Sequence, residues 1–358
     1  MAEKVLIAMS GGVDSAVAAL LIKNEGFDTA AATMKLFDSG LETICEEHSC
    51  CSMKDIDDAK AVAESLSIPH SVFNFASHFR EAVIERFIDA YESGATPNPC
   101  IDCNRFLKFD TLFSEGEKMG CRFVATGHYA RVVEQDGRVV LKKGLDAGKD
   151  QSYVLWSLTK EQLKHVKFPL GNLSKAEVRE IAEQNGFINA KKRDSQDICF
   201  VKNGCYADFI AEYTGKTYPE GNFVDMNGNV LGRHKGIIRY TVGQRKGLGL
   251  SLKEPMYVVR VDKEKNEVVL GKNSDLYSNR LTATGINLTA VDEITAPMRL
   301  KAKVRYSHSE ADCIVTMPTA DSIEVVFDEP QRAITKGQSV VLYDGDTVVG
   351  GGIIDSIG

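Results

Sequence analysis

The sequence predicts an α/β N-terminal domain with a doubly wound, mainly parallel sheet, followed by a small β-rich central domain and a C-terminal β-barrel. Strand-like and helical stretches alternate over roughly the first 200 residues, which is typical of a parallel sheet covered by helices. Beyond this part the pattern changes to short alternating runs broken by glycine and Asp/Asn turns, which indicates antiparallel β structure. We therefore expect domains at residues 1–205, 206–275 and 276–358.

The N-terminal elements follow from hydrophobic spacing and turn residues. Strands are expected at 5–9, 29–36, 70–75 and 122–126, and helices at 14–23, 54–66, 77–92, 105–119, 150–158, 159–164 and 174–185. Ser174 followed by Glu177 is the pattern of a capping box. Ligands of such sheets bind beyond the carboxyl ends of the strands, where residues 10–15 lie.

Composition narrows the class of protein. The chain is 43% hydrophobic and 26% charged, and no apolar run reaches the length of about 18 residues that a membrane helix needs. The N-terminus does not resemble a signal peptide, so we expect a cytosolic protein without a membrane partner. The net charge of −7 argues against a generally basic nucleic-acid binder, yet residues 232–253, 191–193 and 299–305 are locally basic. Such patches are compatible with RNA binding or with ordinary solvated lysines.

Residues 10–15, Ser-Gly-Gly-Val-Asp-Ser, stand between a strand and a helix. No lysine follows the glycines, so this is not a Walker A loop, and it is not G-x-G-x-x-G either. Serine hydroxyls and glycine amides at a helix N-terminus suit a pyrophosphate. An acid inside an anion site is costly unless it holds a cation, so we expect Asp14 to engage Mg²⁺. The alternative is a glycine turn with a serine cap.

The nine cysteines divide into groups by context. Cys121 and Cys313 lie in apolar runs and are expected in the core. Cys100 and Cys103 open a helix after a proline-bracketed loop, where a thiol is more readily ionised. With Cys199 they form a catalytic pair, a metal site or neither; one C-x-x-C does not supply the four ligands of structural zinc. The roles of four others stay open: Cys45, Cys50, Cys51 and Cys205.

The Ser10–Ser15 stretch resembles the pyrophosphate loop of the N-type ATP pyrophosphatases (the PP-loop superfamily), which split ATP between its α and β phosphates and adenylylate a carbonyl-type oxygen. Further stretches resemble the bacterial tRNA-specific 2-thiouridylases, in order along the whole chain. They lie at 34–35, 95–99, 127–130, 149–153, 194–200, 240–248, 303–306 and 337–340. The resemblance implies an adenine nucleotide hydrolase-like first domain and two tRNA-contacting β domains.

The same resemblance implies a reaction. Uracil O2 of the wobble uridine in lysine, glutamate and glutamine tRNAs is adenylylated with ATP and Mg²⁺, and sulfur then displaces AMP. Cys199 matches the persulfide carrier and Cys103 the second catalytic cysteine, which leaves a Cys103–Cys199 disulfide after sulfur transfer. A cysteine desulfurase or sulfur-relay protein is the implied donor.

Other roles are carried over by position. The implied ATP-binding residues are Ala8, Met9, Ser10, Gly11, Gly12, Val13, Asp14, Ser15, Met34 and Gly127. Asn98, Pro99 and Cys100 match the segment around the target base, which must leave its stack to react. The implied tRNA contacts are His128, Lys149, Asp150, Gln151, Arg305, Tyr306 and Gln338. Structural alternatives remain for several: Met34 in the core, His128 as a satisfied buried histidine, and Tyr306 and Gln338 as barrel surface.

The chain departs from the family pattern at Cys100, where the family has aspartate. Cys100, Cys103 and Cys199 would suit three irons of a 4Fe–4S cluster with one iron open for sulfide, so sulfur delivery by persulfide or by cluster stays open. Two other functions remain as alternatives. An amide-forming synthetase of the same superfamily would want a glutaminase segment, which is not visible. A non-enzymatic RNA- or metal-binding protein would leave the intact Ser10–Ser15 loop unexplained.

Overall fold

The computed structural model describes residues 2–38, 53–192, 198–201 and 205–358. The chain divides into two compact units. The first comprises residues 1–84, 99–204 and 346–348, and the second comprises residues 85–98, 205–345 and 349–358. None of the helices in the described part has the length and apolar character needed to cross a membrane.

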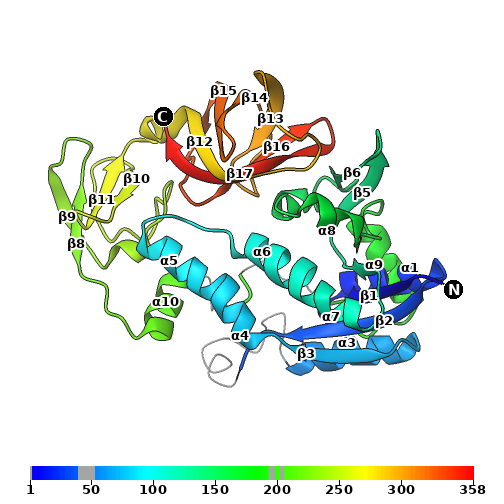
Figure 1. The fold of residues 1–358 in the computed structure, drawn as a ribbon. Helices are drawn as coiled ribbons and strands as arrows, with labels where there is room; N and C mark the ends of the chain where they lie inside the picture. Colours follow the sequence, from blue (N-terminus) through cyan, green and yellow to red (C-terminus); the bar gives the residue numbers. More distant parts are fainter. Residues whose placement is uncertain (1, 39–52, 193–197, 202–204) are drawn as a thin grey trace. The chain divides into compact units, whose positions relative to one another are not determined.

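The first unit is built on a parallel sheet of five strands in the order β3-β2-β1-β4-β7 (Figure 1). These strands are β1 (Lys4–Ala8), β2 (Asp28–Lys35), β3 (His70–Asn74), β4 (Phe123–Ala125) and β7 (Val166–Lys167). The chain moves from β1 outward to β2 and β3 and then returns to β4 on the other side of β1. The strand order therefore reverses between β1 and β4, which is where ligands bind in this class of sheet.

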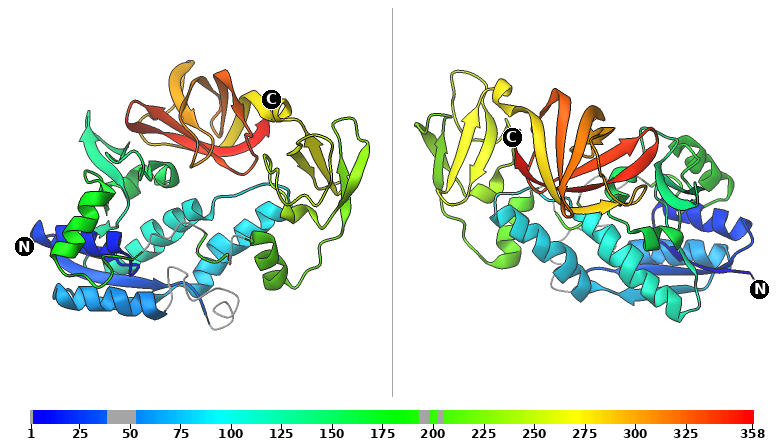
Figure 2. Two further views of the ribbon diagram at one scale, coloured as in Figure 1. Left: turned by 180° about the vertical axis from the view of Figure 1, so that it is seen from behind. Right: turned by 45° about the horizontal axis from the view of Figure 1, so that its top comes forward.

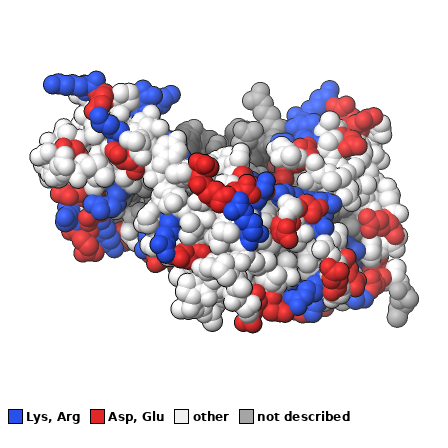
Figure 3. Space-filling view, turned by 90° about the horizontal axis from the view of Figure 1, so that it is seen from above, with Lys and Arg blue, Asp and Glu red and all other residues white. Residues whose placement is uncertain are grey.

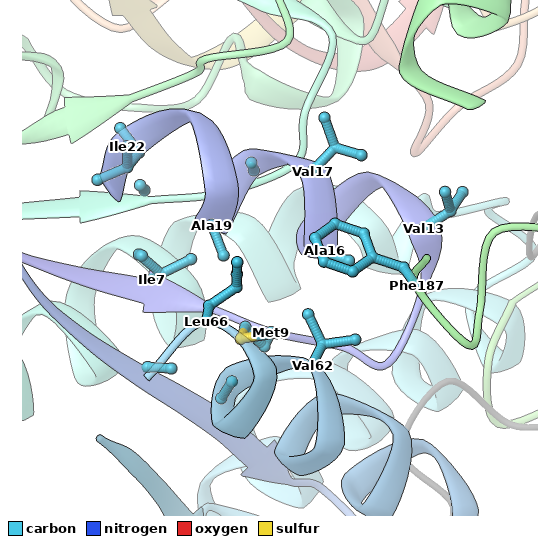
Figure 4. Close-up of a cluster of buried hydrophobic side chains, with 14 of the residues drawn as sticks. Ile7, Met9, Val13, Ala16, Val17, Ala19, Ile22, Val62, Leu66 and Phe187 are labelled. Carbon is cyan, nitrogen blue, oxygen red and sulfur yellow. The ribbon is translucent and has the colours of Figure 1, made fainter. Parts of the chain in front are cut away.

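Helices cover both faces of this sheet (Figures 1 and 2). Alternate residues of β1 point to opposite faces: Val5 and Ile7 pack with α1 (Val13–Asn24), α3 (Met53–Ser65) and α9 (Lys175–Gln184). Figure 4 shows this core, with Ala16 on the side of α1 that faces Val62 of α3. On the other face Leu6 meets Gly116 of α7 (Leu112–Lys118), where a Cβ would lie 3.1 Å from the leucine side chain. The doubly wound, mainly parallel sheet is thus confirmed.

Two long helices of the sequence analysis contain π-helical segments. The expected helix at 77–92 consists of α4 (Ala76–Phe79), the π segment η1 (Arg80–Glu85) and α5 (Arg86–Glu92). The expected helix at 105–119 begins earlier, as α6 (Pro99–Asp102), and continues through the π segment η2 (Cys103–Thr111) into α7. Cys100 and Cys103 therefore lie in the first turns of one continuous helical stretch.

Three expectations for the first two domains are corrected. Residues 150–158 form only a 3-10 turn, η3 (Ser152–Leu155), because Asp150 hydrogen-bonds to Gly144 and Ser152 rather than entering a helix. An antiparallel hairpin, β5 (Ala130–Gln135) with β6 (Arg138–Lys143), interrupts the α/β pattern. Helix α10 (Tyr206–Thr214) stands where only β structure was expected. The expected helix at 159–164 is present as α8 (Lys160–Lys164).

The second unit holds two β structures. A four-stranded sheet has the order β10-β11-β8-β9, with strands β8 (Gly221–Val224), β9 (Val230–His234), β10 (Tyr257–Asp262) and β11 (Glu267–Gly271), and two 3-10 turns, η5 (Ile237–Arg239) and η6 (Asn273–Leu276), lie nearby in sequence. Phe223, Val258 and Leu270 form its core.

The C-terminal strands pair in the order β12-β15-β14-β13-β16-β17, and β12 also pairs with β17, so the sheet closes into a barrel. The strands are β12 (Tyr277–Leu288), β13 (Met298–Lys303), β14 (Ala311–Thr319), β15 (Ser322–Arg332), β16 (Ser339–Asp344) and β17 (Thr347–Ile357). The β-rich central part and the C-terminal barrel are therefore confirmed, while the domain boundaries at 205/206 and 275/276 stay a prediction.

Candidate active site

The loop between β1 and α1 has a backbone that only glycine allows. Gly11 has φ +71°, and a Cβ there would lie 2.3 Å from the backbone oxygen of Asp55. The Ser15 hydroxyl accepts a hydrogen bond from the Ser10 amide (3.2 Å) and donates one to the Gly12 carbonyl (3.0 Å). The loop is folded over the first turn of a 12-residue helix, whose N-terminal amides and dipole favour an anion.

The loop after β4 lies against the same helix N-terminus. A Cβ on Gly127 would come within 2.7 Å of the Asp14 carbonyl carbon and 2.9 Å of the Ser15 nitrogen. The two loops that flank the reversal point of the sheet are therefore in contact, as expected for a shared ligand site. Gly127 and residues 10–15, predicted as nucleotide-binding, are brought together.

Asp14 sits in a small polar cluster that the sequence analysis missed. Its carboxylate accepts hydrogen bonds from Lys175 Nζ (2.7 and 2.8 Å) and from the Tyr129 hydroxyl (2.8 Å). Lys175 begins α9, and its backbone amide donates to Asp146 (2.9 Å). No lysine directly follows the glycines of the loop, but Lys175, 161 residues after Asp14, places its ammonium group there.

A second lysine reaches the loop from behind. Lys192 Nζ donates to the Gly11 carbonyl (3.1 Å) and forms ion pairs with Asp55 and Asp58 (2.6 Å each). Burial lowers the Lys192 pKa, but the hydrogen bonds and charges of the two aspartates outweigh burial, so the pKa is raised overall. Lys192, expected only as part of a basic surface patch, therefore contacts the loop at residues 10–15.

Most of the other residues predicted to bind ATP could contact it mainly through main-chain atoms. The side chains of Met9 and Val13 are buried in the core around α1 (Figure 4). The Met9 carbonyl accepts from the Thr33 hydroxyl at 2.8 Å, and Ala8 ends β1. Met34 is half-buried near the end of β2, beside Phe73 of β3. Any contact of Met9 or Val13 with a nucleotide would thus come from the main chain.

The C-x-x-C pair lies at the start of the long helical stretch. Cys100 is exposed in α6, and Cys103, half-buried, is the first residue of η2. The next residue, Asn104, is buried; its Nδ2 donates to the Val154 carbonyl (2.9 Å), and its Oδ1 accepts from Lys108 Nζ (3.0 Å). These bonds fix the backbone that carries Cys103.

Cys199 is held by its neighbour. Phe200 is buried against Phe79 with ring centroids 5.8 Å apart, and Phe79 in turn packs against Phe37. Cys199 itself is half-buried, in a turn closed by a bond from the Val201 amide to the Ile198 carbonyl (3.0 Å). Most of the matched stretch 194–200, namely 194–197, lies outside the described residues, as do Cys45, Cys50 and Cys51.

None of the described cysteines forms a disulfide: Cys100, Cys103, Cys121, Cys199, Cys205 and Cys313. Within the described part of the chain, no three His, Cys, Asp or Glu side chains come together in a group able to hold a metal. Cys100, Cys103 and Cys199, all among the described residues, therefore do not form the three-thiol group that a 4Fe–4S cluster needs. Cys121 and Cys313 are buried, as predicted, and burial raises the pKa of both thiols, that of Cys313 to about 12.

Four predicted tRNA residues of the first unit have structural partners. His128 is buried between Phe109 and Phe168 and shares a 2.6 Å hydrogen bond with Thr126; burial, aided by the charge of Lys108, keeps its pKa well below the usual value. The other three lie after the β5–β6 hairpin: Asp150 accepts from Gly144 and Ser152, Gln151 accepts from the Tyr129 amide, and the Lys149 amide donates to Asp146. This burial and hydrogen bond fit the alternative that His128 is a satisfied buried histidine.

The predicted tRNA residues of the second unit differ in exposure. Tyr306 is exposed, with the Lys303 ammonium 5.7 Å from its ring centre. Arg305 donates to the Val242 carbonyl (3.0 Å), and Gln338 Nε2 donates to the Thr96 carbonyl (2.8 Å). Gln338 thus holds the irregular segment that leads through Asn98 into the helical stretch beginning at Pro99.

The basic segment 232–253 is partly neutralised by acids from elsewhere in its unit. Arg239 pairs with Asp208 at 2.7 Å, and Arg233 lies 3.8 Å from Glu220. Arg245 and Lys253 line an open hollow of about 350 Å³. Figure 3 shows blue and red side chains interspersed on the face that it draws, without one continuous basic area.

The first unit holds functional groups suited to phosphate binding and to thiol chemistry. The first unit combines an anion-binding helix N-terminus, a carboxylate with two polar partners, and two lysines directed at the loop. It also carries two half-buried thiols, one on a helix and one fixed by a core phenylalanine. Carboxylate and phosphate oxygens together suit Mg²⁺, and the thiols are nucleophiles once ionised.

Comparison with known proteins gives the following. Residues 3–203 match a family model described as tRNA methyl transferase HUP domain, residues 207–272 one described as tRNA methyl transferase PRC-barrel domain, and residues 278–354 one described as aminomethyltransferase beta-barrel domain. The tRNA-specific 2-thiouridylase MnmA of Acetivibrio thermocellus is 51% identical, covering 98% of this chain and 99% of that protein. The protein of the same name from Clostridioides difficile is 48% identical, with 99% of each chain covered. Among solved structures, NMN synthetase from Francisella tularensis has a TM-score of 0.35 and 19% identity, over 61% of this chain and 79% of that chain.

Proposed function

Since this chain belongs to the family of the tRNA-specific 2-thiouridylases, we propose that it is an ATP-dependent tRNA-uridine 2-sulfurtransferase that makes 2-thiouridine. The observation that carries this proposal is the first unit itself. An anion-binding loop at the reversal point of the sheet and two separately anchored thiols, Cys103 and Cys199, belong to the same compact unit. The two thiols favour sulfur chemistry over nucleotide binding alone.

In the proposed activation step, the pyrophosphate of ATP lies on the N-terminus of α1. The uracil O2 attacks the α phosphorus, the bond to the bridging oxygen breaks, and pyrophosphate leaves. Lys175, which pairs with Asp14 in the structure, supplies positive charge beside the phosphates. Asp14 would hold Mg²⁺ together with phosphate oxygens, and the metal would offset phosphate charge when bound. Activation is needed because the uracil oxygen is otherwise a poor leaving group.

In the proposed sulfur step, Cys199 carries the sulfur as a persulfide. The Cys103 thiolate attacks the Cys199 sulfur that bears the –SH group, which forms a Cys103–Cys199 disulfide and releases hydrosulfide. The hydrosulfide adds to C2 of the adenylylated uracil, AMP leaves with the former O2, and one proton is released. A cellular thiol then reduces the disulfide for the next turnover.

The finer parts of the proposal concern substrate and partners. We propose the wobble uridine of lysine, glutamate and glutamine tRNAs as substrate, with Asn98, Pro99 and Cys100 around the target base. The exposed Tyr306 is a better candidate for direct RNA contact than the buried His128. The donor would be a cysteine desulfurase or a sulfur-relay protein, and the place of action the cytosol.

The function is tested with the full chain, ATP, Mg²⁺, a sulfide or persulfide source and unmodified glutamate tRNA. The expected result is 2-thiouridine in the digested tRNA and one AMP and one pyrophosphate per thiolated base. Absence of 2-thiouridine under both aerobic and anaerobic conditions would contradict the proposal.

The roles of the cysteines are tested by single substitutions. Cys103→Ser and Cys199→Ser should abolish thiolation with the physiological type of persulfide donor while tRNA-dependent pyrophosphate release persists. Cys205→Ser is the matched control, because Cys205 is also half-buried and its bond to Asp208 can be kept by a hydroxyl. Visible absorbance from bound iron and sulfur, lost in parallel with activity in Cys100→Ser, would favour the cluster route over the persulfide route.

A further inference from the structure

The carbonyl of Gly11 is held from two sides. It accepts one hydrogen bond from Asn189 Nδ2 and one from Lys192 Nζ, each at 3.1 Å. Lys192 is itself fixed by Asp55 and Asp58 of α3. Residues 178 and 181 positions away thus determine the orientation of a single peptide in the loop at residues 10–15, called the nucleotide loop from here on.

The fixed Gly11 carbonyl also fixes the direction of the Gly12 N–H. The described chain has no cis peptide bonds, so the Gly11 carbonyl and the Gly12 N–H lie in one plane and point in opposite directions. With the carbonyl fixed toward Asn189 and Lys192, the Gly12 N–H faces away from them. A flipped peptide, which glycine at φ +71° could adopt at little cost, would instead present a carbonyl oxygen to the phosphates.

Asn189 lowers the stability of the folded protein relative to an apolar residue at the same position. It is 3% exposed, and its Oδ1 has no hydrogen-bond partner among the described residues. A buried amide with an unsatisfied oxygen costs free energy that an apolar side chain of similar size would not. Its side-chain Nδ2 donates to the Gly11 carbonyl, which indicates that orientation of the loop, and not packing, accounts for the asparagine.

We propose that Asn189 and Lys192 are positioning residues that hold the Gly11–Gly12 peptide with its N–H directed at the pyrophosphate of ATP. The inference rests on the ATP use given under the proposed function and adds two residues that act through the loop backbone. It also links the nucleotide loop to the chain segment that continues toward Cys199.

The test measures ATP affinity and steady-state kinetics of the full-length protein and of Asn189→Leu. Loss of one hydrogen bond that orients an amide toward charge should raise both the Kd and the KM for ATP about tenfold, with kcat at saturating ATP little changed. Because the buried amide is replaced by an apolar group, the melting temperature without ATP should stay the same or rise. A merely structural asparagine would give the reverse: a lower melting temperature and an unchanged KM.

Two further variants complete the test. Lys192→Arg keeps the charge but not the compact ammonium and should also raise the KM for ATP. The control is Lys191→Met at the exposed neighbouring lysine, which should leave the KM for ATP unchanged. An ATP affinity of Asn189→Leu equal to wild type would overturn the inference while leaving the proposed function intact. Failure of the wild-type protein to bind ATP would instead overturn the proposed function, and this inference with it.

Discussion

At the scale of single residues, backbone space decides where the nucleotide loop lies. Gly11 and Gly127 each stand where a Cβ would collide with main-chain atoms of another segment. Such positions could be suspected from the sequence, because glycine is the residue for tight loops after strands. Their partners could not, because the contact of Gly127 with Asp14 depends on how two distant loops meet.

Gly127→Ala should displace the N-terminus of α1, since the added methyl would lie 2.7 Å from the Asp14 carbonyl carbon. We expect ATP-dependent thiolation to fall at least about tenfold, through misplacement of the phosphate-binding amides. Kinetics at varied ATP concentration measure the effect. Gly148→Ala is the control, because the nearest atom to its Cβ is a side-chain oxygen of Asp146 at 3.3 Å; equal losses in both variants would contradict the account.

His128 should make the protein less stable as the pH falls. Its pKa is well below the ordinary value of 6.5, so below pH 6.5 the unfolded chain binds a proton that the folded protein does not. The free energy of unfolding then decreases with falling pH, by at most about 1.4 kcal/mol per pH unit for this one group. His128→Phe should reduce the slope of stability between pH 7 and pH 5.

Part of the slope will remain in His128→Phe, because His70, His234 and His308 have lowered pKa values too. A slope in His128→Phe identical to that of wild type would contradict the prediction.

At the scale of elements, sequence motifs whose residues contact one another within a few positions predicted the structure correctly. The capping box at Ser174 is present as predicted, with the Ser174 hydroxyl accepting from the Glu177 amide and the Glu177 side chain accepting from the Ser174 amide. The π-helical segments were not predicted, because apolar spacing does not separate α from π geometry. The β5–β6 hairpin was missed although Asp136-Gly137 forms its two-residue turn, with positive φ at both residues, and this dipeptide between apolar runs is a strong hairpin signal. Helix α10 was missed because it stands at a change of pattern.

Ser174→Ala should cost about 1 kcal/mol of stability through loss of the cap. Because α9 carries Lys175, which binds Asp14, we also expect a higher KM for ATP. Thr159→Ala removes the matching capping box of α8 and is the control: a similar loss of stability without a change in KM. A rise in KM of equal size in both variants would show that the effect is general destabilisation.

At the scale of the whole molecule, the fold follows from sequence more fully than the site does. Alternating strands and helices predicted the parallel sheet, and short glycine-broken runs predicted the β-rich second half, because these patterns record which faces are buried. The lysines at the loop were not predicted. Lys175 and Lys192 act on Asp14 and Gly11 over separations of 161 and 181 residues, and nothing in a local pattern encodes such a meeting.

In the proposed reaction, the nucleotide loop holds ATP so that the uracil oxygen leaves as part of AMP. The most direct measurement uses glutamate tRNA whose wobble uracil carries oxygen-18 at O2, with ATP and a sulfur source, and follows the label by mass spectrometry. We expect one atom of oxygen-18 in AMP for each 2-thiouridine formed and none in pyrophosphate. Unlabelled AMP, or label in pyrophosphate, alongside 2-thiouridine would contradict it.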